Sequence, residues 1–250
     1  MIRPGASRGE RRQDLTVPEP AFPVPGIVCA PDDEGALRAR FGAFESISPP
    51  DAGFYLSYED DVLMLRRGTD AKGVWVSAAE IDRRLTGEFL LGRACGLPAP
   101  GLSVLDATGG LGIDALALAR RGASVRIVER EAMLWALIED LVRRLDVPDV
   151  STRLADSADV LLEAEIYDVV YLDPMFPARR KKALPGKRMQ YLGALLGEAA
   201  RFDPGLVELA QARARSRVVL KRRLKDPIEL APDWTLKGRS VRYDVFRGNA

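Results

Sequence analysis

The sequence predicts an α/β protein built on a doubly wound, mostly parallel sheet and preceded by a small α+β appendage. From about Gly101 onward, short apolar runs typical of strands alternate with longer amphipathic segments typical of helices. The run 168–172 is apolar after its first residue, as expected of a strand covered on both faces. We therefore expect an extended or partly disordered lead-in over residues 1–50, the appendage over 51–98 and the α/β domain over 99–250.

The bulk composition removes several classes of function. A chain of 250 residues, 47% of them hydrophobic, suits one large domain with a small addition. Two cysteines and no histidine argue against a disulfide framework, the usual zinc sites and Ser-His or Cys-His nucleophile pairs. We therefore expect no metal, and the net charge of +1 gives no global sign of a nucleic-acid partner.

The N-terminus does not have the pattern of a targeting signal. Its arginines are followed by no apolar core, and no stretch approaches the roughly 18 consecutive apolar residues of a membrane span. The sequence therefore predicts a cytoplasmic protein with no membrane partner.

The first hundred residues contain the lead-in and the appendage. Four prolines between residues 18 and 25 are too close together for a helix or a central strand, so we expect extended chain there. Ser77 and Glu80 have the spacing of a capping box, which predicts a helix running to about Cys95 and closed by Gly96. Short antiparallel strands are expected at 54–58, 62–65 and 74–76.

The α/β domain is expected to hold seven strands. Parallel strands are predicted at 102–106, 124–129, 152–155, 168–172 and 218–221, and two more strands at 234–236 and 241–246. Helices are predicted over about 111–121, 134–145 and 191–212. In the second of these, apolar residues recur at i, i+3, i+4 and i+7, so one stripe should face the sheet.

A glycine-rich turn joins the first parallel strand to its helix. Its sequence, Asp106-Ala107-Thr108-Gly109-Gly110-Leu111-Gly112, lets the backbone turn tightly and approach a ligand closely. The same stretch also satisfies the dinucleotide pattern G-x-G-x-x-G/A. Glu129, at the end of the second strand, could accept hydrogen bonds from the ribose of S-adenosylmethionine (AdoMet) or of NAD, so it does not separate the two cofactors.

The segment Asp173-Pro174-Met175-Phe176-Pro177 decides between them. It resembles the Asp/Asn-Pro-Pro-aromatic motif of methyltransferases that modify exocyclic amines of bases. Such an amine is a poor nucleophile, and the Asp173 carboxylate and the Pro174 carbonyl can hold its two hydrogens while the nitrogen faces the methyl group. Phe176 can stack on a base that has left its neighbours. We expect this turn and the glycine-rich turn to open onto one cleft.

Further polar residues fall at strand ends or helix starts where a cofactor would lie. Asp106 could meet the cationic methionine portion of AdoMet, and Asp114 could reach its polar groups. Asp156 and Ser157 follow the third strand, where a side chain can bond the adenine amine, and Arg130 adjoins Glu129. Each of these residues could instead be a helix cap or a surface charge.

Two basic runs predict an RNA-binding surface. One follows the Asp-Pro-Met-Phe-Pro segment directly, so a positive loop should border the reactive position. The other lies around the fifth strand. The candidate RNA contacts are Arg179, Arg180, Lys181, Lys182, Lys187, Arg188, Lys221 and Arg222.

Together these segments resemble the RsmJ family of bacterial small-subunit rRNA guanine-N2 methyltransferases. The resemblance covers about Val76 to Gly248 and rests on DATGGLGIDALALARRGASVRIVER (106–130), VVYLDPMFPARRKKAL (169–184), RVVLKRR (217–223) and RYDVFRG (242–248). It implies a class I methyltransferase core with an antiparallel last strand, AdoMet as cofactor, and methylation of guanosine 1516 of 16S rRNA or of the small subunit. It also implies cofactor contacts by Ile113, Asp114, Glu129, Arg130, Asp156, Ser157 and Asp173.

Three alternatives remain open at this point. The chain could methylate another nucleic-acid exocyclic amine, it could be an NAD-dependent oxidoreductase that uses the same loop and Glu129, or it could be a non-catalytic RNA-binding module. Intact Asp106, Glu129 and Asp173 argue against the last alternative.

Overall fold

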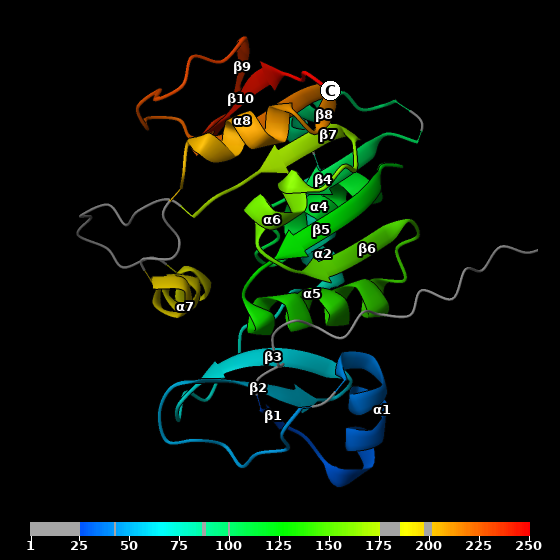
Figure 1. Cartoon of the computed structure of the whole chain (residues 1–250). Helices are drawn as coiled ribbons and strands as arrows, with labels where there is room; N and C mark the ends of the chain where they lie inside the picture. The colour runs from blue at the N-terminus through cyan, green and yellow to red at the C-terminus, as the bar shows by residue number, and fades with distance from the viewer. Residues whose placement is uncertain (1–25, 43, 87–88, 100, 176–185, 198–201) are drawn as a thin grey trace, which may run out of the picture.

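A seven-stranded sheet forms the centre of the α/β domain. The computed structural model describes residues 26–42, 44–86, 89–99, 101–175, 186–197 and 202–250. The strands are β4 (Ser103–Asp106), β5 (Ser124–Glu129), β6 (Val150–Leu154), β7 (Tyr167–Leu172), β8 (Ala214–Arg223), β9 (Trp234–Lys237) and β10 (Val241–Arg247). Their order in the sheet is β6-β5-β4-β7-β8-β10-β9 (Figure 1). Strands β4 to β8 pair in parallel, and β10 is antiparallel to both β8 and β9. The prediction of a mostly parallel sheet with an antiparallel last strand is confirmed.

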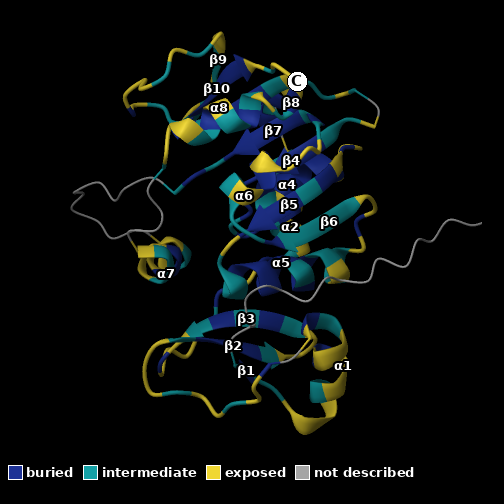
Figure 2. Ribbon diagram, in the orientation of Figure 1, coloured by how far each residue is buried: buried dark blue, intermediate teal, exposed yellow. Residues whose placement is uncertain are grey.

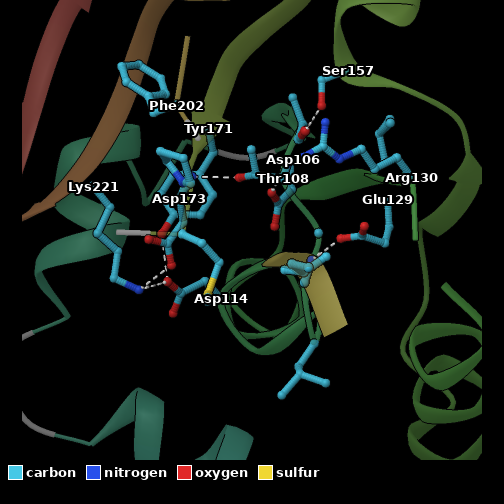
Figure 3. Close-up of a pocket in the computed structure, with 18 of the residues that line it drawn as sticks. Asp106, Thr108, Asp114, Glu129, Arg130, Ser157, Tyr171, Asp173, Phe202 and Lys221 are labelled. Carbon is cyan, nitrogen blue, oxygen red and sulfur yellow. Dashed lines mark hydrogen bonds and ion pairs between the residues drawn. The ribbon is translucent and has the colours of Figure 1, made fainter. Parts of the chain in front are cut away.

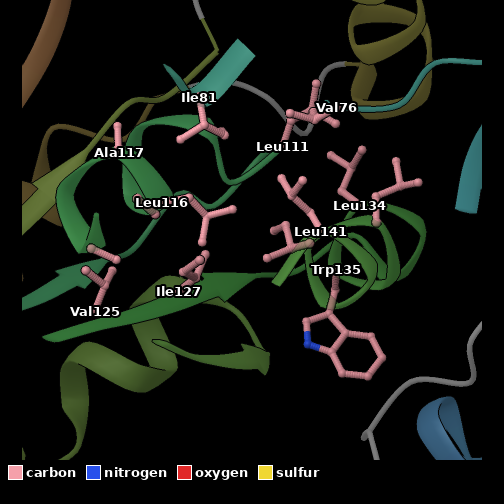
Figure 4. Packing of buried hydrophobic residues seen from close by; sticks show 14 of the residues in the cluster. Val76, Ile81, Leu111, Leu116, Ala117, Val125, Ile127, Leu134, Trp135 and Leu141 are labelled. Carbon is pink, nitrogen blue, oxygen red and sulfur yellow. The ribbon is translucent and has the colours of Figure 1, made fainter. Parts of the chain in front are cut away.

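Side chains alternate between the two faces of this sheet, and each face has its own core. Val104, Val169 and Val219 point to one face and belong to the core that packs against α4 (Ile113–Ala119) and α5 (Ala132–Leu145). Their neighbours in the chain, among them Leu105 and Val218, point to the other face, which α6 (Ser157–Leu162) and α8 (Gly205–Gln211) cover. Figure 2 shows the buried central strands, and Figure 4 shows the first core closely.

A smaller sheet precedes this domain. It contains β1 (Ile27–Val28), β2 (Phe54–Glu59) and β3 (Val62–Arg67), with β2 and β3 antiparallel and β1 parallel to β2. Val74 makes only a single bridge to Leu65, so the strand expected at 74–76 is replaced by an isolated contact.

The expected extended lead-in over residues 1–50 is wrong for its second half. Residues 26–50 contain β1 and the helix α1 (Pro31–Phe41), which buries Leu37 and Phe41. Pro31 lies at the first helical position, where the missing N–H costs nothing, and acidic residues fill the first turn of the helix. The prolines between residues 18 and 25, on which the prediction of extended chain was based, therefore do not determine the structure of residues 26–50.

Two of the predicted helices are each divided in two. The capping box of Ser77 and Glu80 is confirmed, but the helix that it opens, α2 (Ala78–Leu85), ends at an extended Thr86, and α3 (Leu90–Cys95) follows. The predicted helix 191–212 is likewise α7 (Lys187–Leu196) and α8, because Gly197 takes a positive φ and Pro204 starts the second helix. In the described part of the chain, no helix is long and apolar enough to cross a membrane.

Candidate active site at the carboxyl ends of the parallel strands

A cavity of about 670 Å³ lies at the carboxyl ends of β4, β5, β7 and β8. The glycine-rich turn after β4 and the turn after β7 both line it, so the expected common cleft is confirmed. Figure 3 shows side chains from these turns pointing toward one another. A direct bond joins the two turns: the backbone N–H of Asp173 donates to Oγ1 of Thr108 at 2.6 Å. This hydrogen bond holds the backbone of Asp173 in position relative to the glycine-rich turn.

The glycines of the turn have different tasks. A Cβ on Gly109 would come within 2.8 Å of Ile127 and 3.0 Å of the Val128 carbonyl oxygen, so this glycine allows the turn to pack closely on β5. Gly110 has a φ of +57° and also lines the cavity. Gly112 does not line it in the described structure; it begins α4 and faces Ile138. The predicted close approach to a ligand is therefore possible along Gly109 and Gly110.

Asp106 ends β4 and is buried beside the cavity. Its Oδ1 accepts a hydrogen bond of 3.1 Å from the N–H of Thr108. Burial raises the pKa of Asp106 to about 8, and the nearby carboxylates of Asp114 and Asp173 add to the shift. A cation beside this carboxyl would favour its ionised form.

Glu129 ends β5 and closes another side of the cavity. Its carboxylate accepts hydrogen bonds from the N–H of Gly110 at 2.7 Å and of Glu131 at 2.8 Å. Burial raises the pKa of Glu129, and these backbone donors oppose the shift. The backbone N–H of Arg130 is a third donor to this carboxylate, which has about four acceptor positions, so a position remains for a ligand hydroxyl.

Arg130, Asp156 and Ser157 line the same side. Oδ1 of Asp156 caps α6 by accepting from the N–H of Ala158 at 2.9 Å, and its other oxygen lies 3.5 Å from Arg130. The Ser157 hydroxyl donates to the carbonyl of Ala107. Asp156 is thus both a helix cap and a residue that lines the cavity. The two interpretations that the sequence left open for it, helix cap and cofactor contact, do not exclude each other.

Asp114 lies on α4 at the floor of the cavity and belongs to a network of charged groups. Its carboxylate accepts bonds from Arg84 at 2.5 Å, Tyr171 at 2.6 Å and Lys221 at 2.7 Å. Burial by itself would raise the pKa of Asp114, but Lys221 and Arg84 hold it well below its ordinary value. Its main partners are therefore protein groups.

Lys221 is the unexpected member of this network. Its ammonium group also lies 2.6 Å from Oδ2 of Asp173 (Figure 3). Burial would lower the pKa of Lys221, but Asp173 and Asp114 raise it overall. We expected Lys221 to contact RNA, and the structure instead holds its side chain between two carboxylates.

The remaining predicted RNA contacts divide into two groups. Arg188 lines the cavity and pairs with Glu80 at 2.6 Å, and Lys187 donates to the carbonyl of Lys72 at 2.6 Å. Arg222 lies on the face of β8 opposite to Lys221, where it contacts the ring of Phe202. Outside the described residues lie Phe176, Arg179, Arg180, Lys181 and Lys182.

Sequence reasoning missed several residues at the site. Thr108 lies within the glycine-rich turn, but the sequence analysis gave it no role. No nearby residue indicated that Arg84 and Tyr171 belong to the site, because their partner Asp114 is 30 and 57 residues away. The apolar wall of the cavity was missed as well. It consists of Met175, Met189, Leu192, Leu196, Phe202 and Leu206.

The cavity suits a molecule with a charged end, hydroxyl groups and a flat ring. Buried carboxyls at Asp106 and Glu129 stand on either side of the glycine-rich turn, and an apolar wall faces them. These acceptors and surfaces suit AdoMet, and the cavity volume lies within the usual range for small-molecule sites. Within the described ranges, no group of three or more cysteine or carboxylate side chains is arranged to hold a metal ion.

Comparisons with known proteins point in one direction. The family model described as "Putative SAM-dependent methyltransferase" matches residues 40–248. A ribosomal RNA small subunit methyltransferase J from Alkalilimnicola ehrlichii is 37% identical over 91% of this chain and 97% of its own length. Another, from Pseudomonas savastanoi pv. phaseolicola, is 40% identical over 78% of this chain and 80% of its own. The crystal structure of a SAM-dependent methyltransferase from Neisseria gonorrhoeae superposes with a TM-score of 0.69 at 26% identity and covers 89% of this chain and 95% of its own.

Proposed function

We propose that this chain, which belongs to the ribosomal RNA small subunit methyltransferase J family of AdoMet-dependent methyltransferases, methylates the exocyclic N2 of guanosine 1516 in 16S rRNA. The observation that carries the proposal is the shared cavity. Asp173, at the end of β7, borders the same space as the glycine-rich turn after β4 and the carboxyl of Glu129. A methyl donor and an acceptor amine bound there would meet beside Asp173.

The cofactor would be held by the first half of the domain. Glu129 would accept bonds from its ribose hydroxyls, and Asp106 would lie near its cationic methionine portion. Ile113, Arg130 and the pair Asp156 and Ser157 would border its adenine and ribose. When bound, AdoMet supplies an electrophilic methyl group on a sulfonium.

Asp173 and Pro174 would act on the acceptor amine. The Asp173 carboxylate and the Pro174 carbonyl accept its two hydrogens and orient the nitrogen in line with the methyl carbon. The bound cofactor would supply the methyl group, and the Asp173 carboxylate would hold the amine proton that passes to water as the nitrogen is methylated. The rate acceleration would come from positioning of the amine and from the electrostatics of a site with little water.

The apolar wall would receive the base. Met175, Leu192 and Phe202 face the polar side of the cavity, which suits the flat faces of a guanine outside its stack. Arg188 borders this wall and could meet a phosphate or the base edge. The proposed RNA clamp of Phe176, Arg179, Arg180, Lys181 and Lys182 follows the reactive turn directly in the sequence.

The test is the variant Asp173→Ala, assayed on 16S rRNA from cells that lack this gene. We expect it to fold and to bind AdoMet within a few-fold of the wild type, and to lose methylation by at least about 100-fold. Mass mapping of the product should locate the methyl group of the wild-type reaction on N2 of guanosine 1516. Full activity of the variant would show that Asp173 takes no part in the reaction. A methyl group on another nucleotide would show that guanosine 1516 is not the target.

A further inference from the structure

We propose that Lys221 is the positioning residue of Asp173: its ammonium group fixes Oδ2 of that carboxylate, so that Oδ1 is left for the substrate amine. The inference rests on the proposed function of Asp173 and deepens it. Lys221 itself would touch neither the amine nor the methyl group. It would act through the carboxylate that it holds.

The sheet determines where Lys221 points. On β8, Val219 and Lys221 face the α4 side, while Leu220 and Arg222 face the α8 side. Strands β7 and β8 are parallel neighbours, and Leu172 pairs with Leu220. The next residue in each segment, Asp173 after Leu172 and Lys221 after Leu220, therefore lies beside the other. Lys221 thus lies on β8, and Asp173 directly follows β7 with its backbone N–H bonded to Thr108, so the framework positions both ends of the 2.6 Å contact.

Asp114 and Asp173 differ in the number of cations that pair with them. Asp114 has Arg84 as a second cationic partner, at 2.5 Å. For Asp173, Lys221 is the one cation within 4 Å among the residues that the structure describes. Removal of Lys221 would thus leave Asp114 paired and Asp173 unpaired.

Burial and Lys221 have opposite effects on the pKa of Asp173. Burial raises this pKa, and Lys221 is the largest influence in the other direction. Without Lys221 the carboxyl would hold its proton to higher pH, and a protonated carboxyl offers the amine one fewer acceptor position. The titratable and charged groups that face it from the surrounding elements are Arg84 (α2), Asp106 (β4), Asp114 (α4), Tyr171 (β7), Lys221 (β8) and Tyr243 (β10).

The experiment compares Lys221→Met with Lys221→Arg and with a matched control, Arg217→Met. Arg217 lies on the same strand and the same face but contacts the Ala94 carbonyl and the ring of Trp234, away from Asp173. Three quantities are measured for each protein: the ionisation of Asp173, by carbon-13 NMR of aspartate-labelled protein with Asp173→Asn for assignment; the Kd of AdoMet; and kcat against pH.

We expect Lys221→Met to raise the pKa of Asp173, to bind AdoMet within about threefold of the wild type, and to lose kcat at pH 7 by at least about tenfold. The loss should shrink as the pH rises, since the carboxyl then ionises without help. Lys221→Arg should recover part of kcat, and Arg217→Met should leave the Asp173 titration unchanged.

Three results would overturn the proposal: an unchanged Asp173 titration in Lys221→Met, a loss of kcat equal at every pH, or a wild-type Asp173 that is already protonated at pH 7. The last measurement needs no variant and stands even if Lys221→Met does not fold. The NMR readout is independent of turnover, so a failure of the proposed function, seen as an active Asp173→Ala, remains distinguishable from a failure of this inference.

Discussion

At the scale of single residues, the site is built from carboxyls in different electrostatic surroundings. Asp114 is held ionised by Arg84 and Lys221, which keep its pKa low despite burial. Asp106, on the neighbouring strand end, is buried with a backbone N–H as a partner, and its pKa is raised to about 8. Two aspartates that border one cavity thus differ in charge near neutral pH, because one faces cations and the other does not gain enough from hydrogen bonding to offset burial.

We expect Asp106 to make AdoMet binding depend on pH, because its pKa is raised to about 8. A cationic ligand favours the ionised carboxyl, so below pH 8 binding must remove its proton, and affinity should fall by up to about tenfold per pH unit. Above pH 8 the affinity should level off. Titration calorimetry at pH 7, in two buffers of different protonation enthalpy, should detect release of about one proton per AdoMet bound.

The matched variant is Asp106→Asn, which removes the titrating group and keeps its shape. It should bind AdoMet more weakly at high pH and lose the pH dependence between 6 and 8. If wild type and variant release the same number of protons, Asp106 is not the group linked to binding.

At the scale of elements, α7 connects the cavity to the N-terminal sheet. On one side its residues Met189, Leu192 and Leu196 line the cavity. On the other side Tyr191 packs edge-on against Phe54 of β2, with ring centroids 5.5 Å apart, and donates to Asp70. Figure 1 shows α7 beside the N-terminal part of the molecule and away from the strands of the larger sheet. The small sheet thus contributes to the site by anchoring one of its walls.

Tyr191→Ala should therefore loosen α7 without unfolding the sheet domain. The change removes both the ring contact and the hydrogen bond of a side chain that is only 3% exposed. Backbone amides of α7 should exchange with deuterium at least about tenfold faster, while those of β4 and β7 keep their protection. Met189→Ala, at a side chain 49% exposed, is the control and should leave the exchange of α7 within twofold. Unchanged protection of α7 in Tyr191→Ala would show that other contacts hold the helix.

At the scale of the whole molecule, Asp140 joins the N-terminal part to the larger domain. It lies on α5 with its side chain 0% exposed and bonds Arg40 of α1 at 3.2 Å, Arg144 at 2.6 Å and the N–H of Leu63 on β3 at 3.2 Å. Arg144 in turn donates to the Val76 carbonyl. One buried carboxylate therefore neutralises cations from both parts of the chain and satisfies a strand N–H.

Asp140→Ala should be one of the most destabilising single changes in this protein. It leaves two half-buried guanidinium groups and the N–H of Leu63 without their carboxylate, a loss of about 3–5 kcal/mol in the free energy of unfolding. For a chain of this size that corresponds to a fall in Tm of roughly 6–20 °C. Calorimetry would measure it. Asp61→Asn, at a side chain 67% exposed that also pairs with an α5 arginine, should cost less than about 1 kcal/mol. Equal effects of the two variants would mean that Asp140 does not join the two parts.

Much of the fold follows from local patterns in the chain. The strands from Ser103 to Leu172 lie within two residues of their predicted bounds, because apolar period and turn residues act over a few positions. The helix breaks were harder to predict. The segments of α2 and α3 were predicted as one helix, and so were those of α7 and α8, whereas Thr86 is extended and Gly197 has a positive φ. The α6 helix was missed because its 6 residues make fewer than about two turns, too few for a period to be recognised.

By itself, the sequence determined the mostly parallel α/β class through its alternating strand and helix patterns, the glycine-rich turn through its residue types, and the candidate carboxylate Asp173 through the Asp-Pro-Met-Phe-Pro motif. Only the tertiary structure decided which charges meet: Lys221 lies between Asp114 and Asp173, and Arg84 reaches Asp114 from another helix. The physical reason is range. Backbone preferences and side-chain alternation are set by neighbours in the chain, whereas an ion pair depends on which distant segments the packing of the sheet and helices brings within 4 Å.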